Sequence, residues 1–208
     1  MSILHSQSNE TAKGFASITS TVTVLPLDNV DTDQIIPARF LKVTDSEGLG
    51  SHVFEDIRRS PDGTLRNDFS LNRPDRAGSN ILVAGDNFGC GSSREHAAWA
   101  LKGAGIRAVI STSFADIFRG NALKNGVLPV ALQPDVCAAL TKLDRSDSTV
   151  TVDLELQEVR WEGGSAPFRI DAFARKCLLE GVDELGYILT HEAAIVDFEQ
   201  RRMKRGEA

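Results

Sequence analysis

The sequence predicts an α/β protein in which a parallel core sheet is combined with an antiparallel layer. From residue 81 to residue 130, apolar runs typical of buried strands alternate with helical segments, and this alternation implies parallel strands joined by right-handed crossovers. Residues 149–161 have a long β-pattern, Gly163-Gly164 predicts a turn, and residues 168–170 return. That arrangement is typical of an antiparallel hairpin, so the hydrophobic pattern predicts both parts of the fold.

The N-terminal third is predicted to contribute one strand and two loops. Residues 17–27 alternate and are rich in β-branched side chains, which indicates a strand. Residues 28–41 are rich in turn-forming side chains. Residues 42–76 are polar and rich in Gly, Asp, Asn and Pro, so we expect a mobile loop with little core to hold it. The polar residues 1–14 are expected to be disordered.

The core is predicted as strand, helix, strand, helix and strand. Ser113 is expected to cap the second of these helices, in which Phe114, Ile117, Phe118 and Leu123 share one face. The expected strands are 81–84, 108–110 and 127–130, and the expected helices are near 93–102, 113–126, 134–143, 171–180 and 191–203.

Composition excludes several classes of function. The chain has 208 residues, 41% of them hydrophobic and 25% charged, and we expect residues 15–200 to form a single domain with a tail at 201–208. The net charge of −6 argues against a surface for nucleic acid or for an anionic membrane. No apolar run approaches the ~20 residues of a membrane span, and the N-terminus lacks the pattern of a secretory signal. The cytoplasm is therefore the expected location.

The three cysteines do not form a recognisable framework. Cys90, Cys137 and Cys177 are odd in number and widely spaced, and no C-x-x-C pair occurs. Such a set predicts neither a disulfide scaffold nor an iron–sulfur or zinc site held by this chain alone. We therefore expect no metal ligands in this chain.

Residues 81–102, ILVAGDNFGCGSSREHAAWALK, predict an anion site. A buried strand is followed by a glycine-rich turn and by the start of a helix, whose first backbone N–H groups lack intrahelical partners. Ser92, Ser93 and Arg94 add two hydroxyls and a guanidinium at this point. The alternative is that Ser92 and Glu95 form a capping box and only begin a helix. Arg94 favours the anion site, because a cation in the first turn opposes the helix dipole at a cost of roughly 0.3–1 kcal/mol.

Four separate motifs resemble those of one enzyme family. GCGSSREHAAWAL, at residues 89–101, resembles the active-site motif of the mobile domain of the aconitase superfamily. NVDTDQIIPARFL at 29–41, SFADIFRGNALKNGVLP at 113–129 and FRIDAFARKCLLEGVDELG at 168–186 follow in the order found in bacterial 3-isopropylmalate dehydratase small subunits. The resemblance implies a swivelling β/β/α domain. It also implies a hydro-lyase of leucine biosynthesis that acts only with a large subunit, which carries a [4Fe–4S] cluster.

The same resemblance assigns roles to individual residues. Ser92 is implied to be the catalytic base, while Ser93, Arg94 and the Gly91 turn hold a carboxylate of a small dicarboxylate substrate. Thr32 and Asp33 match a Thr-Asp pair on an active-site loop, although a simple turn before Pro37 explains them equally well.

The sequence departs from the family in one loop. A basic residue and Thr usually precede its G-x-G, whereas Ser46 and Glu47 stand here. Because the family uses this loop to select substrate, a related alkylmalate or citraconate-type dehydratase remains an alternative. A non-catalytic anion-binding module is a second alternative.

Other polar residues are weaker candidates. Arg39 resembles an ordinary surface arginine, and His96 is more typical of a packing residue than of a base. Cys90 could act as a nucleophile with His96, but nothing else completes a triad. Asn121 and Asn125 are expected to order the end of a helix.

Overall fold

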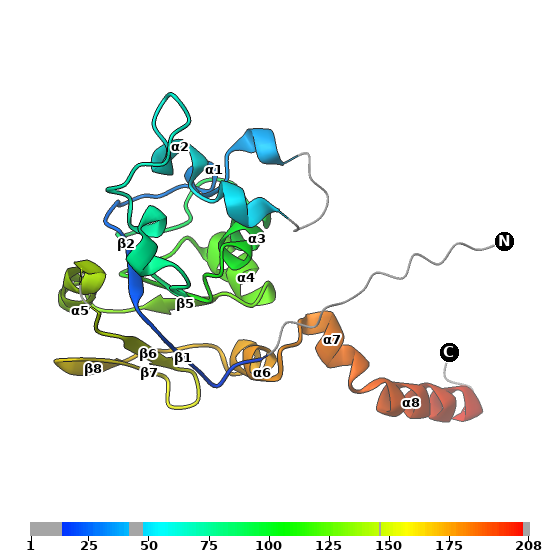
Figure 1. Cartoon of the computed structure of the whole chain (residues 1–208). Helices are drawn as coiled ribbons and strands as arrows, with labels where there is room; N and C mark the ends of the chain where they lie inside the picture. Colours follow the sequence, from blue (N-terminus) through cyan, green and yellow to red (C-terminus); the bar gives the residue numbers. More distant parts are fainter. Residues whose placement is uncertain (1–13, 42–47, 146, 206–208) are drawn as a thin grey trace.

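Two four-stranded sheets form the framework of the protein in a computed structural model that describes residues 14–41, 48–145 and 147–205 (Figure 1). One sheet has the order β2-β3-β4-β5 and is parallel throughout; the other has the order β1-β6-β7-β8 and is antiparallel. The parallel strands are β2 (Val22–Leu25), β3 (Ile81–Ala84), β4 (Ala108–Ser111) and β5 (Leu128–Ala131). The antiparallel strands are β1 (Ser17–Ser20), β6 (Val150–Asp153), β7 (Glu158–Trp161) and β8 (Gly164–Pro167).

Alternate residues of the parallel strands enter two separate hydrophobic clusters. Val83 and Ile110 pack between the two sheets, together with Val152 of the antiparallel sheet. Leu82 and Val109 pack on the other face, against helices α3 (His96–Gly103) and α4 (Asp116–Lys124). The layers are therefore sheet, sheet and helix, which confirms the predicted fold class.

The predicted strand at 17–27 is two strands in different sheets. β1 pairs with β6, and after the single residue Thr21 the chain continues as β2 beside β3. The crossing is fixed by side chains, because Asn80 N donates to Ser20 Oγ at 2.9 Å and the Thr21 and Ser79 hydroxyls lie 2.6 Å apart. The prediction of one continuous strand is wrong.

The predicted strand at 149–161 is likewise divided. β6 ends at Asp153, whose Oδ1 accepts from Leu156 N at 2.9 Å, and the turn closes at Gln157 with φ +54°. The predicted turn at Gly163 is present with φ +108°, and β8 begins at once at Gly164 rather than at Phe168.

The predicted helices are present, but their first residues differ from those that the sequence predicts. α4 begins at Asp116 and is not capped by Ser113, whose Oγ instead donates to Asp86 Oδ1 at 2.7 Å. Ile117 is 55% exposed, so it does not share the buried face of Phe118. The helices that follow α4 are α5 (Pro134–Thr141), α6 (Ala172–Glu180), the unpredicted α7 (Glu184–Leu189) and α8 (Glu192–Arg205).

The part of the expected loop 42–76 that the structure describes has its own buried side chains. It contains α2 (Glu55–Arg58) and the short 3-10 turns η2 (Leu49–His52), η3 (Ser70–Asn72) and η4 (Pro74–Arg76). Val53 and Phe54 are fully buried, and Ser70 Oγ accepts from the edge-strand amide of Val24 at 3.0 Å. The expectation of little core is wrong from residue 48 onward. Ser46 and Glu47 lie outside the described residues.

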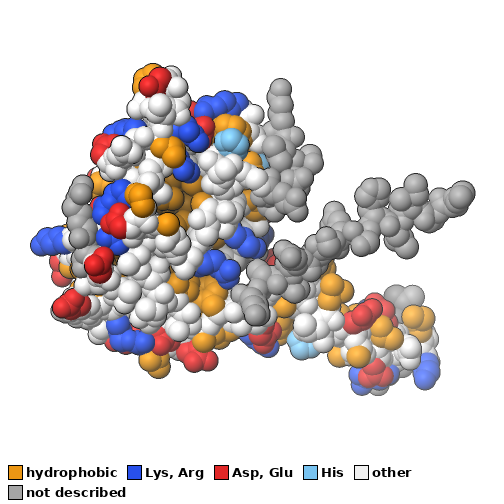
Figure 2. All heavy atoms as spheres, viewed as in Figure 1, with side chains coloured by type: hydrophobic (Ala, Val, Ile, Leu, Met, Phe, Trp, Pro, Cys, Tyr) orange, Lys and Arg blue, Asp and Glu red, His pale blue; other side chains and the backbone are white. Residues whose placement is uncertain are grey.

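The surface carries mixed charges. On the face in Figure 2, basic and acidic side chains are interspersed over the body. Helix α8 extends away from the body, and its exposed apolar side chains include Ile195 and Phe198 (Figures 1 and 2). In the part of the chain that the structure describes, no helix combines the length and the apolar character needed to cross a membrane.

Candidate active site

The loops that follow β2 and β3 meet at the carboxyl ends of these parallel strands. Leu25 and Ala84, the last residues of the two strands, are register partners, so both loops leave from the same edge of the sheet. The loops then pair again, because Gly89 N donates to Val30 O at 2.7 Å and Thr32 N donates to Cys90 O at 2.9 Å. This edge is where open α/β sheets bind ligands.

A capping box positions the short helix α1 (Thr32–Ile35). Asp31 Oδ1 accepts from Gln34 N at 2.7 Å, and Gln34 Oε1 accepts from Asp31 N at 2.9 Å. The equivalent pattern at Ser92 and Glu95 is not a capping box, since α3 begins at His96 without a side-chain cap. The alternative that Ser92 serves only as a helix cap is therefore wrong.

Ser92 is exposed and lies against Thr32. Their hydroxyl oxygens are 3.2 Å apart, and Thr32 Oγ1 also lies 3.4 Å from Ser92 O. Thr32 is only 1% exposed, so the core fixes its hydroxyl. The arrangement orients the Ser92 hydroxyl from one side and leaves it open to solvent on the other.

Arg94 forms an ion pair with Asp33. The guanidinium Nη1 donates to Asp33 Oδ1, and the two side chains are 28% and 51% exposed. A pair this accessible contributes little to stability, about 0–1 kcal/mol. It does hold the guanidinium at Asp33, the residue that follows Thr32, and Nη1 is the only guanidinium nitrogen bonded within the described residues, so other donor atoms are available to a ligand.

The turn from Gly91 to Arg94 presents unpaired backbone donors. Among the described residues, none accepts a hydrogen bond from the N–H groups of Ser92, Ser93 or Arg94. Gly91 has φ +92°, a conformation that glycine adopts without strain. A run of free N–H groups beside a guanidinium is an anion-binding arrangement.

The opposite side of the turn is held by α4. A Cβ on Gly89 would lie 2.1 Å from Phe118 Cγ, so only glycine allows this close packing. Asn121 Nδ2 donates to Ser93 O at 3.1 Å. The sequence predicted Asn121 only as a helix-end residue and missed this contact, which joins residues 28 positions apart.

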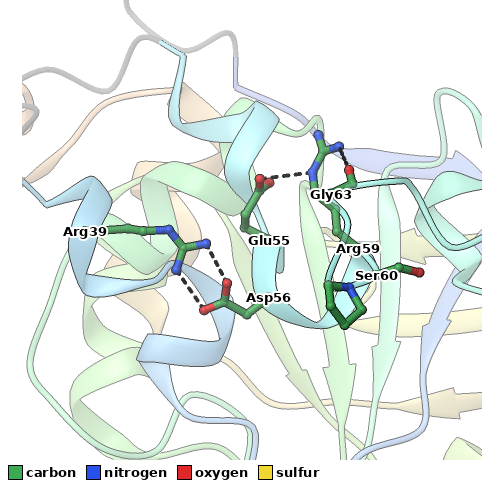
Figure 3. Close-up of a pocket in the computed structure, with 7 residues that line it drawn as sticks. Arg39, Glu55, Asp56, Arg59, Ser60 and Gly63 are labelled. Carbon is green, nitrogen blue, oxygen red and sulfur yellow. Dashed lines mark hydrogen bonds and ion pairs between the residues drawn. The ribbon is translucent and has the colours of Figure 1, made fainter.

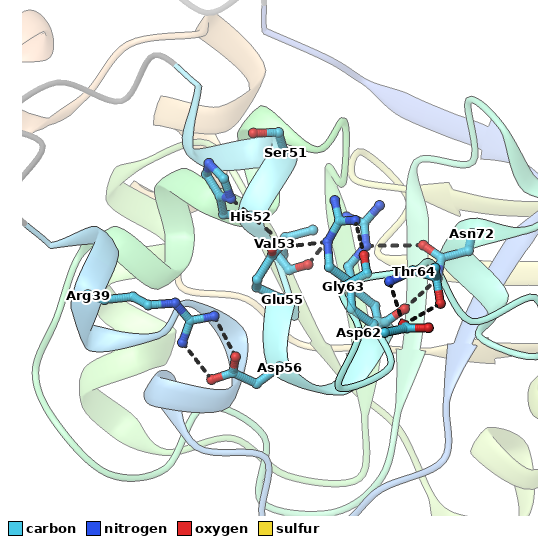
Figure 4. Close-up of polar contacts among 12 residues, drawn as sticks. Arg39, Ser51, His52, Val53, Glu55, Asp56, Asp62, Gly63, Thr64 and Asn72 are labelled. Atoms are coloured by element: carbon cyan, nitrogen blue, oxygen red, sulfur yellow. Dashed lines mark hydrogen bonds and ion pairs between the residues drawn. The ribbon is translucent and has the colours of Figure 1, made fainter.

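The weaker candidates lie elsewhere or make other contacts. Arg39 forms a two-pronged pair with Asp56, at 3.0 and 2.5 Å, and lines a pocket of about 350 Å³ with Glu55 and Arg59 (Figure 3). The Arg39 guanidinium lowers the pKa of Asp56 below its ordinary value. Figure 4 shows that this polar cluster continues to Asn72 and includes none of the residues around Ser92.

His96 and Cys90 do not form a nucleophilic pair. The His96 ring packs against Trp99 in a tilted arrangement, with the ring centres 4.7 Å apart and the ring planes 48° apart. Cys90 Sγ donates to Asn29 O at 3.3 Å. Within the described residues, no group of three or more His, Cys, Asp or Glu side chains could hold a metal ion.

Comparison with known proteins identifies the class of this domain. The Aconitase C-terminal domain family matches residues 12–135, more than half of the chain, and the chain therefore belongs to this family. Within it, the chain groups with the 3-isopropylmalate dehydratase small subunits. The relative from Anaeromyxobacter dehalogenans strain 2CP-C is 61% identical over 89% of this chain and 96% of its own, and that from Chloroflexus aggregans is 56% identical over 88% and 92%.

A solved structure agrees with this grouping. The 3-isopropylmalate dehydratase (leuD) of Methanocaldococcus jannaschii is 30% identical, covers 87% of this chain and 98% of its own, and superposes with a TM-score of 0.65. The predicted resemblance and the predicted fold class are both confirmed.

Proposed function

We propose that the chain is the small subunit of a hydro-lyase that interconverts 2-isopropylmalate and 3-isopropylmalate by removing and re-adding water. This reaction belongs to leucine biosynthesis, and we place it in the cytoplasm. The proposal rests on relatives that carry this enzyme name at 52–61% identity over about nine-tenths of the chain. The convergence of Thr32, Asp33, Ser92 and Arg94 on one sheet edge supports it.

The reaction requires three chemical functions. A base removes a proton from the carbon next to a carboxylate, a Lewis acid holds the departing hydroxyl, and donors bind the carboxylates as charge develops. We assign the first function to Ser92, whose hydroxyl is oriented by Thr32. A serine is a weak base, and the free backbone N–H groups of the turn supply the donors that would stabilise its deprotonated form.

We assign the binding of a substrate carboxylate to Arg94, Ser93 and the Gly91 turn. Arg94 already holds a carboxylate, that of Asp33, so the geometry needed for a substrate anion is present. A dicarboxylate that enters the turn binds the guanidinium donors that Asp33 leaves open, and it gains the free N–H groups as well. Asp33 keeps Arg94 in place both before and after the substrate binds.

The Lewis acid is assigned to the large subunit. The relatives are named small subunits, which implies a larger partner. In this chain Cys137 and Cys177 are buried and Cys90 is half-buried, and the described residues offer no cluster ligands. A [4Fe–4S] cluster on the partner would supply the Lewis acid for the substrate hydroxyl, while this chain supplies the base and the carboxylate site.

A related alkylmalate or citraconate-type substrate is the second candidate. The departure at Ser46 and Glu47 favours it, because Ser46 replaces the basic residue and the acidic Glu47 replaces the Thr in the loop that the family uses for selection. The large subunit and the chemistry would be the same.

The test is the activity of the complex reconstituted with its large subunit. Ser92→Ala should abolish hydration of the unsaturated intermediate while folding and subunit association stay intact. Ser51→Ala is a matched control, since among the described residues this exposed hydroxyl contacts only Gly48 O, to which it donates at 2.7 Å. An active Ser92→Ala complex would contradict the assigned base. The isolated chain should bind no iron, and a visible cluster absorption in it would contradict the division of roles.

A further inference from the structure

We propose that Asn121 is a positioning residue for this reaction, because its amide fixes the Ser93–Arg94 peptide in the orientation in which the Arg94 N–H stabilises the charge that develops in the transition state. The inference rests on the proposed function and adds a residue that does not touch the reacting atoms. It starts from one contact, in which Asn121 Nδ2 donates to Ser93 O at 3.1 Å.

The contact determines where a backbone donor points. In a planar trans peptide the C=O and the following N–H point in opposite directions. Because Ser93 O points to α4, the N–H of Arg94 points away from α4. That N–H has no acceptor among the residues that the structure describes, and Ser92 and Ser93 beside it are exposed. The Asn121 amide thus directs a free donor to the open side of the turn.

The helix that carries Asn121 is itself anchored on the same turn. Phe118, one helical turn earlier, is 2% exposed and packs on Gly89, and its ring centre lies 5.2 Å from that of Phe88. The turn is thus held by α1 through Thr32 and by α4 through Asn121. A donor held from both sides is preorganised for a transition state.

Asn125, also in the RGNALKNG segment, makes a different connection. Its Nδ2 donates to Asn121 O at 2.8 Å, and its Oδ1 accepts from Trp99 Nε1 at 2.7 Å. Asn125 therefore joins α4 to α3, whereas the Asn121 side chain joins α4 to the turn. The expected role of ordering a helix end fits Asn125 and does not account for the contact of Asn121.

The experiment compares Asn121→Ala with Asn125→Ala in the reconstituted complex. Removing one transition-state donor typically costs about 10²–10³ in kcat, and an untethered peptide still samples the correct orientation. We therefore expect Asn121→Ala to lower kcat by about 10- to 100-fold, with KM changed by less than about threefold. Asn125→Ala should lower the melting temperature at least as much as Asn121→Ala does, while its kcat stays within about twofold of wild type.

Two further variants separate positioning from packing. Asn121→Asp preserves the side-chain volume but replaces the donor by an acceptor facing Ser93 O, so it should be at least as slow as the alanine variant. Asn121→Gln keeps a donor on a longer arm and should recover part of kcat.

The experiment distinguishes failure of this inference from failure of the proposed function. An active wild-type complex with an active Asn121→Ala variant overturns this inference alone. So does a loss of kcat that follows the melting temperature equally in the Asn121 and Asn125 variants. An inactive wild-type complex would overturn the proposed function and this inference with it.

Discussion

Arg94 donates to the carboxylate of Asp33, so the cation assigned to the substrate is occupied by an anion of the protein itself. The two residues come from loops that follow different strands and are 61 positions apart. Because the pair is partly accessible to solvent, it contributes little to stability, and its main effect is to place the guanidinium.

Replacing Arg94 by Lys should lower turnover strongly while barely changing stability. An ammonium is a point charge and cannot reproduce a planar two-pronged contact with a carboxylate. We expect kcat/KM to fall at least tenfold and the melting temperature to stay within about 2 °C. Arg39→Lys is the matched control, since Arg39 pairs with a carboxylate, that of Asp56, but lies in the separate polar cluster. Near-wild-type activity of Arg94→Lys would remove Arg94 from the substrate ligands.

Replacing Asp33 by Asn should separate the placement of Arg94 from folding. The free energy of unfolding should change by less than about 1 kcal/mol, as for exposed ion pairs generally. Turnover should fall about tenfold, because the guanidinium loses the carboxylate that orients it. Asp56→Asn breaks the comparable exposed pair with Arg39 and should leave turnover unchanged. Equal kinetics of both variants would mean that Asp33 does not orient Arg94.

Replacing Gly89 by Ala should destabilise the protein and inactivate the complex. Gly89 has φ +78°, and the added Cβ would collide with the Phe118 ring. We expect a loss of at least about 2 kcal/mol in the free energy of unfolding. Gly63→Ala has nearly the same φ, +84°, with nothing within 4 Å, and should cost only about 1 kcal/mol. Denaturant titration of both variants isolates the cost of the collision, and equal losses would argue against it.

Replacing Ser46-Glu47 by Arg-Thr should shift substrate preference. The proposed substrate is a dianion and the change makes this loop more positive, so the ratio of kcat/KM between isopropylmalate and smaller alkylmalates should move by more than about threefold. Competition between the two substrates in the reconstituted complex measures this ratio directly. An unchanged ratio would show that the loop does not select the substrate, and the second candidate function would lose its support.

Alkaline pH should destabilise the protein through Cys137. Burial raises the pKa of this thiol from 9.0 to about 11. The folded state therefore keeps the proton longer than the unfolded state, and the resulting stability is complete below pH 9 and is lost as pH rises toward 11. Cys137→Ala should flatten the fall in stability between these values. Burial also raises the pKa of Cys177, so some slope should persist. Parallel curves for wild type and variant would contradict the assignment.

Local pattern was enough to predict the parallel core. Its strands are short apolar runs, and Ile81–Ala84 is buried at every position. The division of residues 17–27 could not be predicted, because the β-branched pattern runs through Thr21 without a break. The change of sheet depends on Ser79 and Asn80, which are about 60 residues away in the chain.

The sequence predicted the residues of the candidate site that stand in motifs, but not the contact that helix α4 makes with them. The serines and Arg94 stand in one motif, and the resemblance added Thr32 and Asp33. Distance along the chain hid the contact of Asn121 with Ser93. The capping-box pattern at Ser92 and Glu95, weighed as the alternative to an anion site, forms no capping box, whereas Asp31 and Gln34 do form one. Sequence spacing alone does not distinguish the two, because the outcome depends on which segment becomes the helix.

The division of the first β-segment also sets an order of events during synthesis. Thr19 in β1 pairs with Thr151, 132 residues later, so at 5–20 residues per second the ribosome needs on the order of 10 s to deliver that partner. The parallel strands and the segments that carry Thr32, Ser92 and Asn121 are all made before β6 emerges. The nascent chain can thus assemble its reactive edge first and close the antiparallel sheet last, with β1 waiting as an unpaired strand in the meantime.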